Sequence, residues 1–250
     1  MKLTEPVPGG PCWVELSTSD VPAARAYYAG LFGWRCETDP RPEAGGYTTA
    51  RVDEDAVAAL SPLYQPGRPP AWTVSFAAED ADASADAVRD AGGTVLMEPM
   101  DIFDQGRFAV AADPSGAVFS LWQARAFPGA GRFNSPGALG WVELRTPDPQ
   151  GALAFYPAAL GWTADAQERF THWGVDGADF GGLKEQDDDE RAGTPPHWVP
   201  YFVVSDAETT AARALTTGGE PITPPARVPG GPWVATLRDP LGARFGIRTP

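Results

Sequence analysis

The chain contains an internal duplication, and this feature constrains its fold more than any other. At an offset of 128 residues, Trp13–Leu16 (WVEL) recurs as Trp141–Leu144. Further along the chain the offset becomes 126, so that Asp113 and Pro114 match Asp239 and Pro240. Matches that keep their order over such a length are typical of repeated structural units. We therefore predict two homologous domains, at 10–124 and 138–249, joined by a Gly/Pro/Arg-rich linker at 125–137.

Each half has the pattern of a strand, a helix and three strands, and then the same pattern again. The segment 12–18 alternates as a half-buried strand does, and Asp20 followed by Pro22 is typical of a helix start. Gly33 predicts the left-handed cap that ends this helix. The other elements predicted in the first half are strands at 34–38, 47–52, 57–63, 72–78, 94–99, 107–112 and 118–123, and a helix between Asp80 and Gly92. The fold class that follows is α+β, with two βαβββ units per domain.

Composition limits the classes of partner. The net charge of −14, from 33 acidic and 19 basic residues, disfavours binding to nucleic acid. The first residues lack the apolar run of a signal peptide, and no stretch has the roughly 20 apolar residues that span a bilayer. We expect a cytoplasmic protein with no membrane partner. Cys12 and Cys36 lack the spacing of a metal or redox pair and are expected to be free thiols.

Two motifs, in the same order in both halves, carry a family resemblance. The first is Tyr-x4-Gly-Trp at the end of the first helix, and the second is the DPxG hairpin before the last strand. The residues that form them are Tyr28, Gly33, Trp34, Asp113 and Gly116, and again Tyr156, Gly161, Trp162, Asp239 and Gly242. With the predicted βαβββ units, the chain resembles the vicinal oxygen chelate superfamily, which includes glyoxalase I, bleomycin resistance proteins and extradiol dioxygenases. It is most similar to tandem two-domain, glyoxalase-like members.

The resemblance implies a divalent metal held by His and Glu on a cupped sheet, where it binds neighbouring oxygens of a substrate. In this chain the eight matching positions hold Trp13, Ala59, Thr73 and Ser120, and Trp141, Gly182, Val199 and Gly246. None offers the imidazole or carboxylate that such a metal needs. We therefore predict no metal and no other cofactor. A relocated metal bound by Glu143 and His197 stays as an alternative.

Aromatic residues stand where the family's metal ligands would point into the cup. We predict that Trp13 and Trp141 line the cups with an apolar surface that suits a flat aromatic ligand. Glu15 and Glu143 share their sheet faces, and Trp122 lies near the end of the first domain, matched by Arg248 in the second. We predict ligand binding by Trp13, Glu15, Trp122, Trp141 and Glu143, and expect the two cups to differ.

Three functions stay open at this point. The first is a metal-independent protein, like the bleomycin resistance proteins, that binds an aromatic or hydrophobic molecule. The second is a glyoxalase-like lyase or isomerase, or an oxidoreductase, with His172, His197 or Glu143 as acid or base. The third is a scaffold with vestigial cups. A monomer and a homodimer both fit the sequence, and we interpret the acidic run 187–190 as a solvated loop because it lacks the pattern of a calcium loop.

Overall fold

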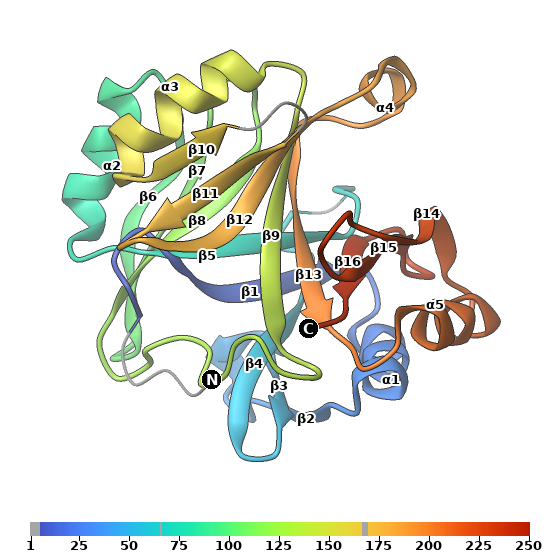
Figure 1. Ribbon diagram of the computed structural model, residues 1–250. Coiled ribbons are helices and arrows are strands. Elements are labelled where there is room, and N and C mark those ends of the chain that lie inside the picture. The colour runs from blue at the N-terminus through green and yellow to red at the C-terminus, as the bar shows by residue number, and fades with distance from the viewer. Residues whose placement is uncertain (1–5, 66, 167–169) are drawn as a thin grey trace.

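The structure is a computed structural model that describes residues 6–65, 67–166 and 170–250 (Figure 1). The first half contains β1 (Pro11–Thr18), α1 (Val21–Phe32), β2 (Arg35–Thr38), a short 3-10 turn (Pro42–Ala44), β3 (Thr48–Val52), β4 (Asp55–Pro62), β5 (Ala71–Ala77), α2 (Ala81–Asp90), β6 (Thr94–Ile102), β7 (Gly106–Ala112) and β8 (Val118–Ala124). The second half contains β9 (Leu139–Thr146), α3 (Pro149–Leu160), β10 (Thr163–Ala166), β11 (Thr171–Val175), β12 (Ala178–Glu185), α4 (Asp188–Gly193), β13 (His197–Val203), α5 (Ala207–Thr216), β14 (Glu220–Arg227), β15 (Trp233–Arg238) and β16 (Arg244–Arg248). The predicted α+β class and the paired βαβββ units are confirmed.

Each half forms one eight-stranded mixed sheet. The strand order is β2-β3-β4-β1-β5-β8-β7-β6 in the first and β10-β11-β12-β9-β13-β16-β15-β14 in the second. The first strands of the two units, β1 and β5, pair antiparallel at the centre, and each pairs in parallel with the last strand of its own unit. The repeated sequence therefore places Trp13 and Trp141 on equivalent central strands.

The helix ends follow the repeated capping residues. Asp20 accepts a hydrogen bond from the backbone N–H of Ala23, and Asp148 accepts one from Gly151. Gly33 and Gly161 both end their helices with φ of 71°, in the left-handed region that glycine tolerates. These caps fix α1 and α3 at matching places in the two halves.

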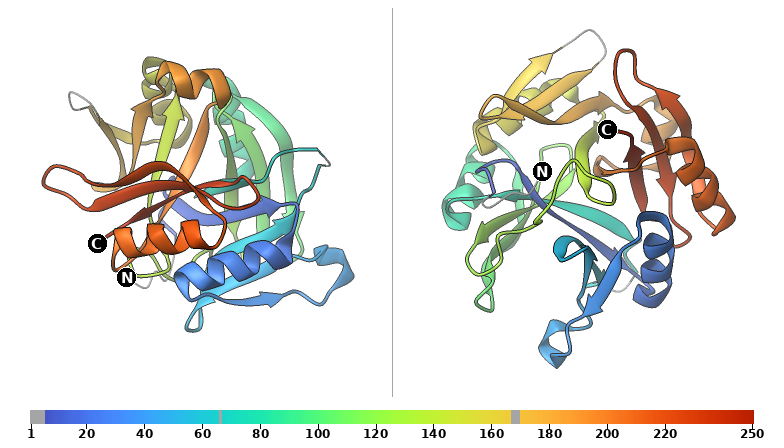
Figure 2. Two further views of the ribbon diagram at one scale, coloured as in Figure 1. Left: turned by 90° about the vertical axis from the view of Figure 1, so that its right-hand side faces the viewer. Right: turned by 60° about the horizontal axis from the view of Figure 1, so that its bottom comes forward.

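Helices from different halves pack side by side. The pair α1 and α5 and the pair α2 and α3 each join the two domains, as two views of the ribbon show (Figure 2). Aromatic side chains fill the space between the central strands: the rings of Phe76 and Trp198 lie 5.3 Å apart, and those of Trp72 and Phe202 lie 5.1 Å apart. The core is therefore shared between the halves.

Two buried hydrogen-bond chains connect the repeated motifs across the halves. The hydroxyl of Tyr28 donates to Asp239 (2.9 Å) and accepts from the indole of Trp72 (3.0 Å). In the other direction, Tyr156 donates to Asp113 (3.1 Å). The motif tyrosine of each half thus binds the hairpin aspartate of the other. A role for these motifs in joining the domains was not anticipated from the sequence.

One predicted element is wrong. The acidic run 187–190 caps and begins helix α4 and does not form a loop, although Asp187, Asp188 and Asp189 are exposed to solvent as predicted. Asp187 caps the helix by accepting from the N–H of Glu190, and acidic side chains in the first turn are favoured by the helix dipole. The side chain of Glu190 is largely buried in an ion pair. Among the described helices, none has the length and apolar character to cross a membrane.

Candidate ligand-binding site

Each sheet has a face turned away from the shared core, which we call cup 1 where it carries Trp13 and Glu15 and cup 2 where it carries Trp141 and Glu143. Alternation along β1 puts Trp13 and Glu15 in cup 1, while Val14 and Leu16 enter the shared core. The same alternation along β9 puts Trp141 and Glu143 in cup 2. The structure therefore places the predicted tryptophan and glutamate pairs on the predicted faces.

Cup 1 is filled by the chain itself. The ring of Phe127, from the linker, lies edge-on to Trp13 with ring centroids 4.9 Å apart, and 6.0 Å from the ring of Trp122. The indole N–H of Trp122 donates to the carbonyl of Phe127 at 2.9 Å. Only 5% of Trp13 and 8% of Trp122 is exposed. The structure brings these two predicted ligand-binding residues together, but with Phe127 already against them.

The carboxyl group of Glu15 also has partners from its own half. It accepts hydrogen bonds from the hydroxyls of Ser61 (2.8 Å) and Tyr64 (2.6 Å). Burial raises the pKa of Glu15, and these hydrogen bonds oppose the rise only in part. Nearby, the indole of Trp13 donates to the hydroxyl of Tyr47 at 3.0 Å. Glu15 is therefore a satisfied polar group in this conformation.

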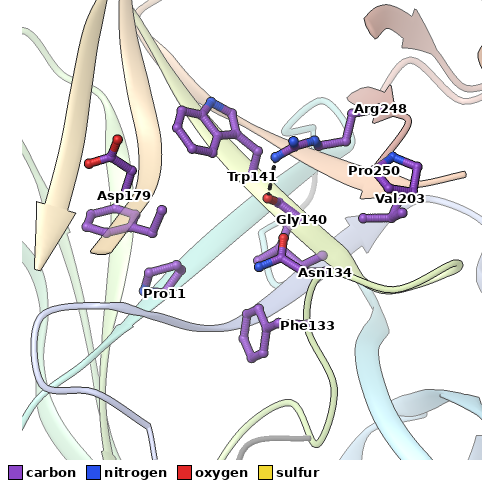
Figure 3. Close-up of a pocket in the computed structure, with 11 residues that line it drawn as sticks. Pro11, Phe133, Asn134, Gly140, Trp141, Asp179, Val203, Arg248 and Pro250 are labelled. Carbon is purple, nitrogen blue, oxygen red and sulfur yellow. Dashed lines mark hydrogen bonds between the residues drawn. The ribbon is translucent and has the colours of Figure 1, made fainter. Parts of the chain in front are cut away.

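Cup 2 contains an open pocket of about 460 Å³. Trp141 and Arg248 lie at its wall, with the guanidinium carbon 5.7 Å from the centroid of the indole ring (Figure 3). Phe133 of the linker, Phe180 of β12 and Asp179 complete much of the lining. Of the predicted site residues, Trp141 is the one that lines this pocket.

The open pocket and the filled cluster in cup 1 occupy equivalent places in the repeat. The register pairs Ala77 with Trp122 in the first sheet and Val203 with Arg248 in the second. Val203, Arg248 and Trp141 line the pocket, and their counterparts Ala77, Trp122 and Trp13 surround Phe127. Where cup 1 holds an aromatic ring, cup 2 is open.

His172 is not part of the pocket lining but contacts two residues that are. Its ring is 5.5 Å from that of Trp141, and its Nδ1 is 2.8 Å from a carboxylate oxygen of Asp179. Because Asp179 lines the pocket, this pair places a proton-transfer group beside it. The predicted candidate His172 is therefore close to Trp141.

Glu143 belongs to a separate buried cluster in cup 2, and the half-buried His197 of β13 lies opposite Arg145 of this cluster. Arg145 lies 3.3 Å from Glu143 and 3.2 Å from Glu190 of α4, and the hydroxyl of Tyr201 donates to Glu143 at 3.3 Å. Burial raises the pKa of Glu143, opposed by the charges of Arg145 and Lys184. Burial also lowers the pKa of His197, whose Nδ1 lies 2.8 Å from the carbonyl of Pro195. The structure does not bring these two residues into the Trp141 pocket.

The positions where the family would hold a metal do not fit one. A side chain at Gly182 or Gly246 would collide with the rings of Phe170 and Tyr201, which lie over these glycines. Across residues 6–65, 67–166 and 170–250, no group of three or more His, Cys, Asp or Glu side chains could hold a metal ion. The described residues therefore offer no imidazole or carboxylate ligands at the strand positions where the family holds its metal.

Similarity to known proteins agrees with the architecture. The family model described as "Glyoxalase/Bleomycin resistance protein/Dioxygenase superfamily" matches residues 11–121 and again 138–247. The chain belongs to this superfamily. The expected resemblance to tandem glyoxalase-like proteins of the vicinal oxygen chelate group is confirmed.

Two curated relatives match almost end to end. One is "Putative glyoxylase CFP32" of Mycobacterium tuberculosis, 40% identical over 258 residues, which cover 100% of this chain and 98% of the relative. The other is "Anthracycline biosynthesis protein DnrV" of Streptomyces peucetius, 39% identical, covering 98% of this chain and 94% of the relative. Proteins that share a fold can have many different activities, so the names of these relatives do not establish a reaction for this chain.

Solved structures share the fold at low sequence identity. The Mn(II)-bound glyoxalase from Novosphingobium aromaticivorans has a TM-score of 0.70 at 17% identity, covering 97% of this chain and 82% of that one. The 2,2',3-trihydroxybiphenyl 1,2-dioxygenase of Sphingomonas wittichii has a TM-score of 0.68 at 14% identity, covering 98% and 91%. At this identity the likeness shows the fold.

Sequence reasoning did not assign a role to three residues that distinguish the two cups, namely Phe127 in cup 1 and Asp179 and Arg248 at the pocket of cup 2. Phe127 lies in a segment interpreted only as a linker, and Asp179 lies on an exposed strand end with no motif. For Arg248 the sequence did give a signal, because the duplication aligns it with Trp122 and the two copies therefore differ at this position. Departures between the two copies are therefore as informative as their matches.

Proposed function

We propose that the protein binds a flat aromatic small molecule in the cup 2 pocket, against Trp141. The observation that carries this proposal is the place of Phe127 in cup 1. An aromatic ring of the chain itself lies edge-on to Trp13, and the equivalent space beside Trp141 is open. The ring of Phe127 in cup 1 therefore shows the kind of group, an aromatic ring, that we expect to bind beside Trp141 in cup 2.

The pocket has the properties of a small-molecule site. Its volume of about 460 Å³ falls within the range of roughly 300–1,000 Å³ that such sites occupy. Its wall combines aromatic rings with a few polar groups, namely Arg248, Asp179 and Asn134. Anthracyclines are flat polycyclic aromatic compounds, so the similarity to an anthracycline biosynthesis protein supports a polycyclic ligand.

Binding in this proposal needs no metal. The walls recognise the ligand by ring contacts and hydrogen bonds, and the positions of the family's metal ligands carry Trp, Gly, Ala, Thr, Ser and Val. The predicted absence of a cofactor stays a prediction, which elemental analysis of the purified protein can test. Near-stoichiometric metal would contradict it.

A second candidate function rests on His172 and Asp179. Their 2.8 Å contact beside the pocket could accept or deliver a proton on a bound ligand, as in an enzyme of the glyoxalase or hydroxylase type. In that case His172→Ala would abolish turnover while leaving ligand affinity within a few fold. A purely binding protein would show no turnover in either form.

The test is a titration with a neutral tetracyclic or anthraquinone probe, followed by tryptophan fluorescence and calorimetry. We expect saturable binding with one site per chain, weakened at least tenfold in Trp141→Ala. Trp233→Ala is the matched control, because Trp233 is 39% exposed and lies outside the pocket. Absence of saturable binding, or equal loss in both variants, would reject the proposal and favour a scaffold with vestigial cups.

A further inference from the structure

The pocket contains an arginine, Arg248, that forms no ion pair with any residue that the structure describes. Arg248 is half-buried, and burial lowers the pKa of its guanidinium group. Within the described residues, its guanidinium group donates hydrogen bonds to backbone carbonyls, from Nη1 to Gly140 (2.9 Å) and from Nε to Thr249 (3.3 Å). In the part of the chain that the structure describes, no carboxylate forms a salt bridge with it. Partly buried charges are usually paired, so this side chain differs from the paired Arg145 in the same cup.

The guanidinium group is held in place but not saturated. An arginine has five N–H donors in a planar fork, and the two carbonyls engage two of them. The carbonyls therefore fix the orientation of the group beside Trp141 and leave donors for a ligand. A fixed fork matches the two oxygens of a carboxylate better than a mobile ammonium would.

The opposite side of the pocket has the opposite charge. Asp179 and Arg248 lie on either side of Trp141 (Figure 3). Asp179 also contacts Nδ1 of His172 at 2.8 Å. A ligand with an anionic oxygen would therefore place that oxygen at Arg248 and its hydrogen-bond donors toward Asp179.

We propose that Arg248 binds an anionic oxygen of the ligand, so that cup 2 selects aromatic acids over their neutral analogues. This inference rests on the proposed function and adds the chemical class of the ligand. It also explains why the repeat differs here: the equivalent Trp122 packs on Phe127 in the filled cup, whereas an arginine beside an open pocket is available to a ligand.

The experiment compares two probes of one shape, anthraquinone-2-carboxylate and anthraquinone-2-carboxamide, at neutral pH. We expect the wild type to bind the acid about tenfold or more tightly than the amide, the size of one charge-assisted hydrogen-bond pair. Arg248→Met should abolish this preference, so that the acid and the amide bind with affinities within about twofold of each other. Arg227→Met, which removes an exposed arginine outside the pocket, should keep the preference.

The outcomes separate the two proposals. Equal wild-type affinities for acid and amide would overturn the role of Arg248 and leave aromatic binding intact. Binding of neither probe would reject aromatic binding itself. The preference is measured first on the wild-type protein, so a folding defect in Arg248→Met cannot hide the answer. Arg248→Lys, which keeps the charge without the fork, should retain part of the preference.

Discussion

At the scale of single residues, Trp13 and Trp141 show how one repeated position can have two roles. Both follow from the same WVEL sequence and both face a cup. Trp13 is buried under Phe127 and donates to Tyr47, whereas Trp141 is partly exposed at an open pocket. The environment, and not the residue type, decides whether the indole stabilises the fold or meets a ligand.

Replacing each tryptophan by alanine should separate these roles. Trp13→Ala should lower the free energy of unfolding by roughly 3–5 kcal/mol, because it leaves a cavity in a packed cluster. Trp141→Ala should lower it by about 1 kcal/mol or less, because part of this ring is already in contact with water. Urea unfolding of both variants measures the difference, and equal losses would contradict it.

Glu15 should make stability depend on pH in a defined direction. Because burial raises its pKa, the folded protein keeps the proton in a pH range where the unfolded chain has lost it. The contribution of this group to stability is therefore present at low pH and is lost as the pH rises through the folded pKa. Glu15→Gln, which cannot ionise, should gain stability relative to wild type between pH 4 and pH 8.

The measurement is the melting temperature of both proteins across that pH range. Glu37→Gln is a suitable control, because Glu37 is an exposed surface residue of the same half. We expect the melting temperature of Glu15→Gln to rise relative to that of wild type as the pH increases. A difference that shrinks with increasing pH would contradict the prediction, because it would mean that the fold stabilises the charged form of Glu15.

At the scale of elements, the linker has a structural role in addition to joining the domains. The N–H of Ala130 donates to Cys12 of β1 and that of Gly131 to Ala56 of β4, which holds the segment across cup 1. Gly129 approaches Cys12 so closely that a Cβ there would lie 2.4 Å from its carbonyl oxygen. Glycine is needed at this point, and it lets Phe127 reach Trp13.

Removing the ring of Phe127 should therefore open cup 1. Phe127→Ala should lower the free energy of unfolding by about 3 kcal/mol and create an apolar space between Trp13 and Trp122. A small aromatic compound such as indole should raise the melting temperature of this variant more than that of wild type. Phe103→Ala is the control, because Phe103 is 49% exposed. Equal shifts in all three proteins would mean that the cup collapses.

The elements were predictable from sequence where periodicity and capping were strong. Alternation and the paired aspartate and glycine caps predicted the strands and helices of both halves, although β6 runs on to Ile102. Helix α4 was missed because an acidic run carries no apolar face from which a short helix can be read. The filling of cup 1 was missed because Phe127 gains its role from packing across the sheet and not from any local pattern.

At the scale of the whole molecule, the halves depend on each other for their cores. Each motif tyrosine binds an aspartate of the other half, and the indoles of Trp34 and Trp162 donate to Gly137 and Gly9 at 2.7 Å. Sequence repeats predicted two domains but could not show that their helices pack in mixed pairs. A sequence repeat predicts which helices and strands each half contains, but it does not predict how the two halves pack against each other.

This interdependence predicts a single unfolding transition. Tyr28→Phe should leave Asp239 and the indole of Trp72 without the hydroxyl between them, at a cost of about 1–3 kcal/mol. Because the core is shared, calorimetry should show one heat-absorption peak that moves to lower temperature as a whole. Tyr156→Phe should act in the same way, and two resolved peaks in either variant would contradict a shared core.

The open pocket beside a filled one has a consequence for how such a protein can evolve. In an assembly of two identical chains, every substitution appears in both sites at once, so a ring that closes one site closes both. A covalent tandem removes this constraint. Phe127 and Arg248 are each present once, and each changes one cup without its copy. Fusion of the two halves therefore lets one former site become scaffold while the other stays free to acquire a ligand.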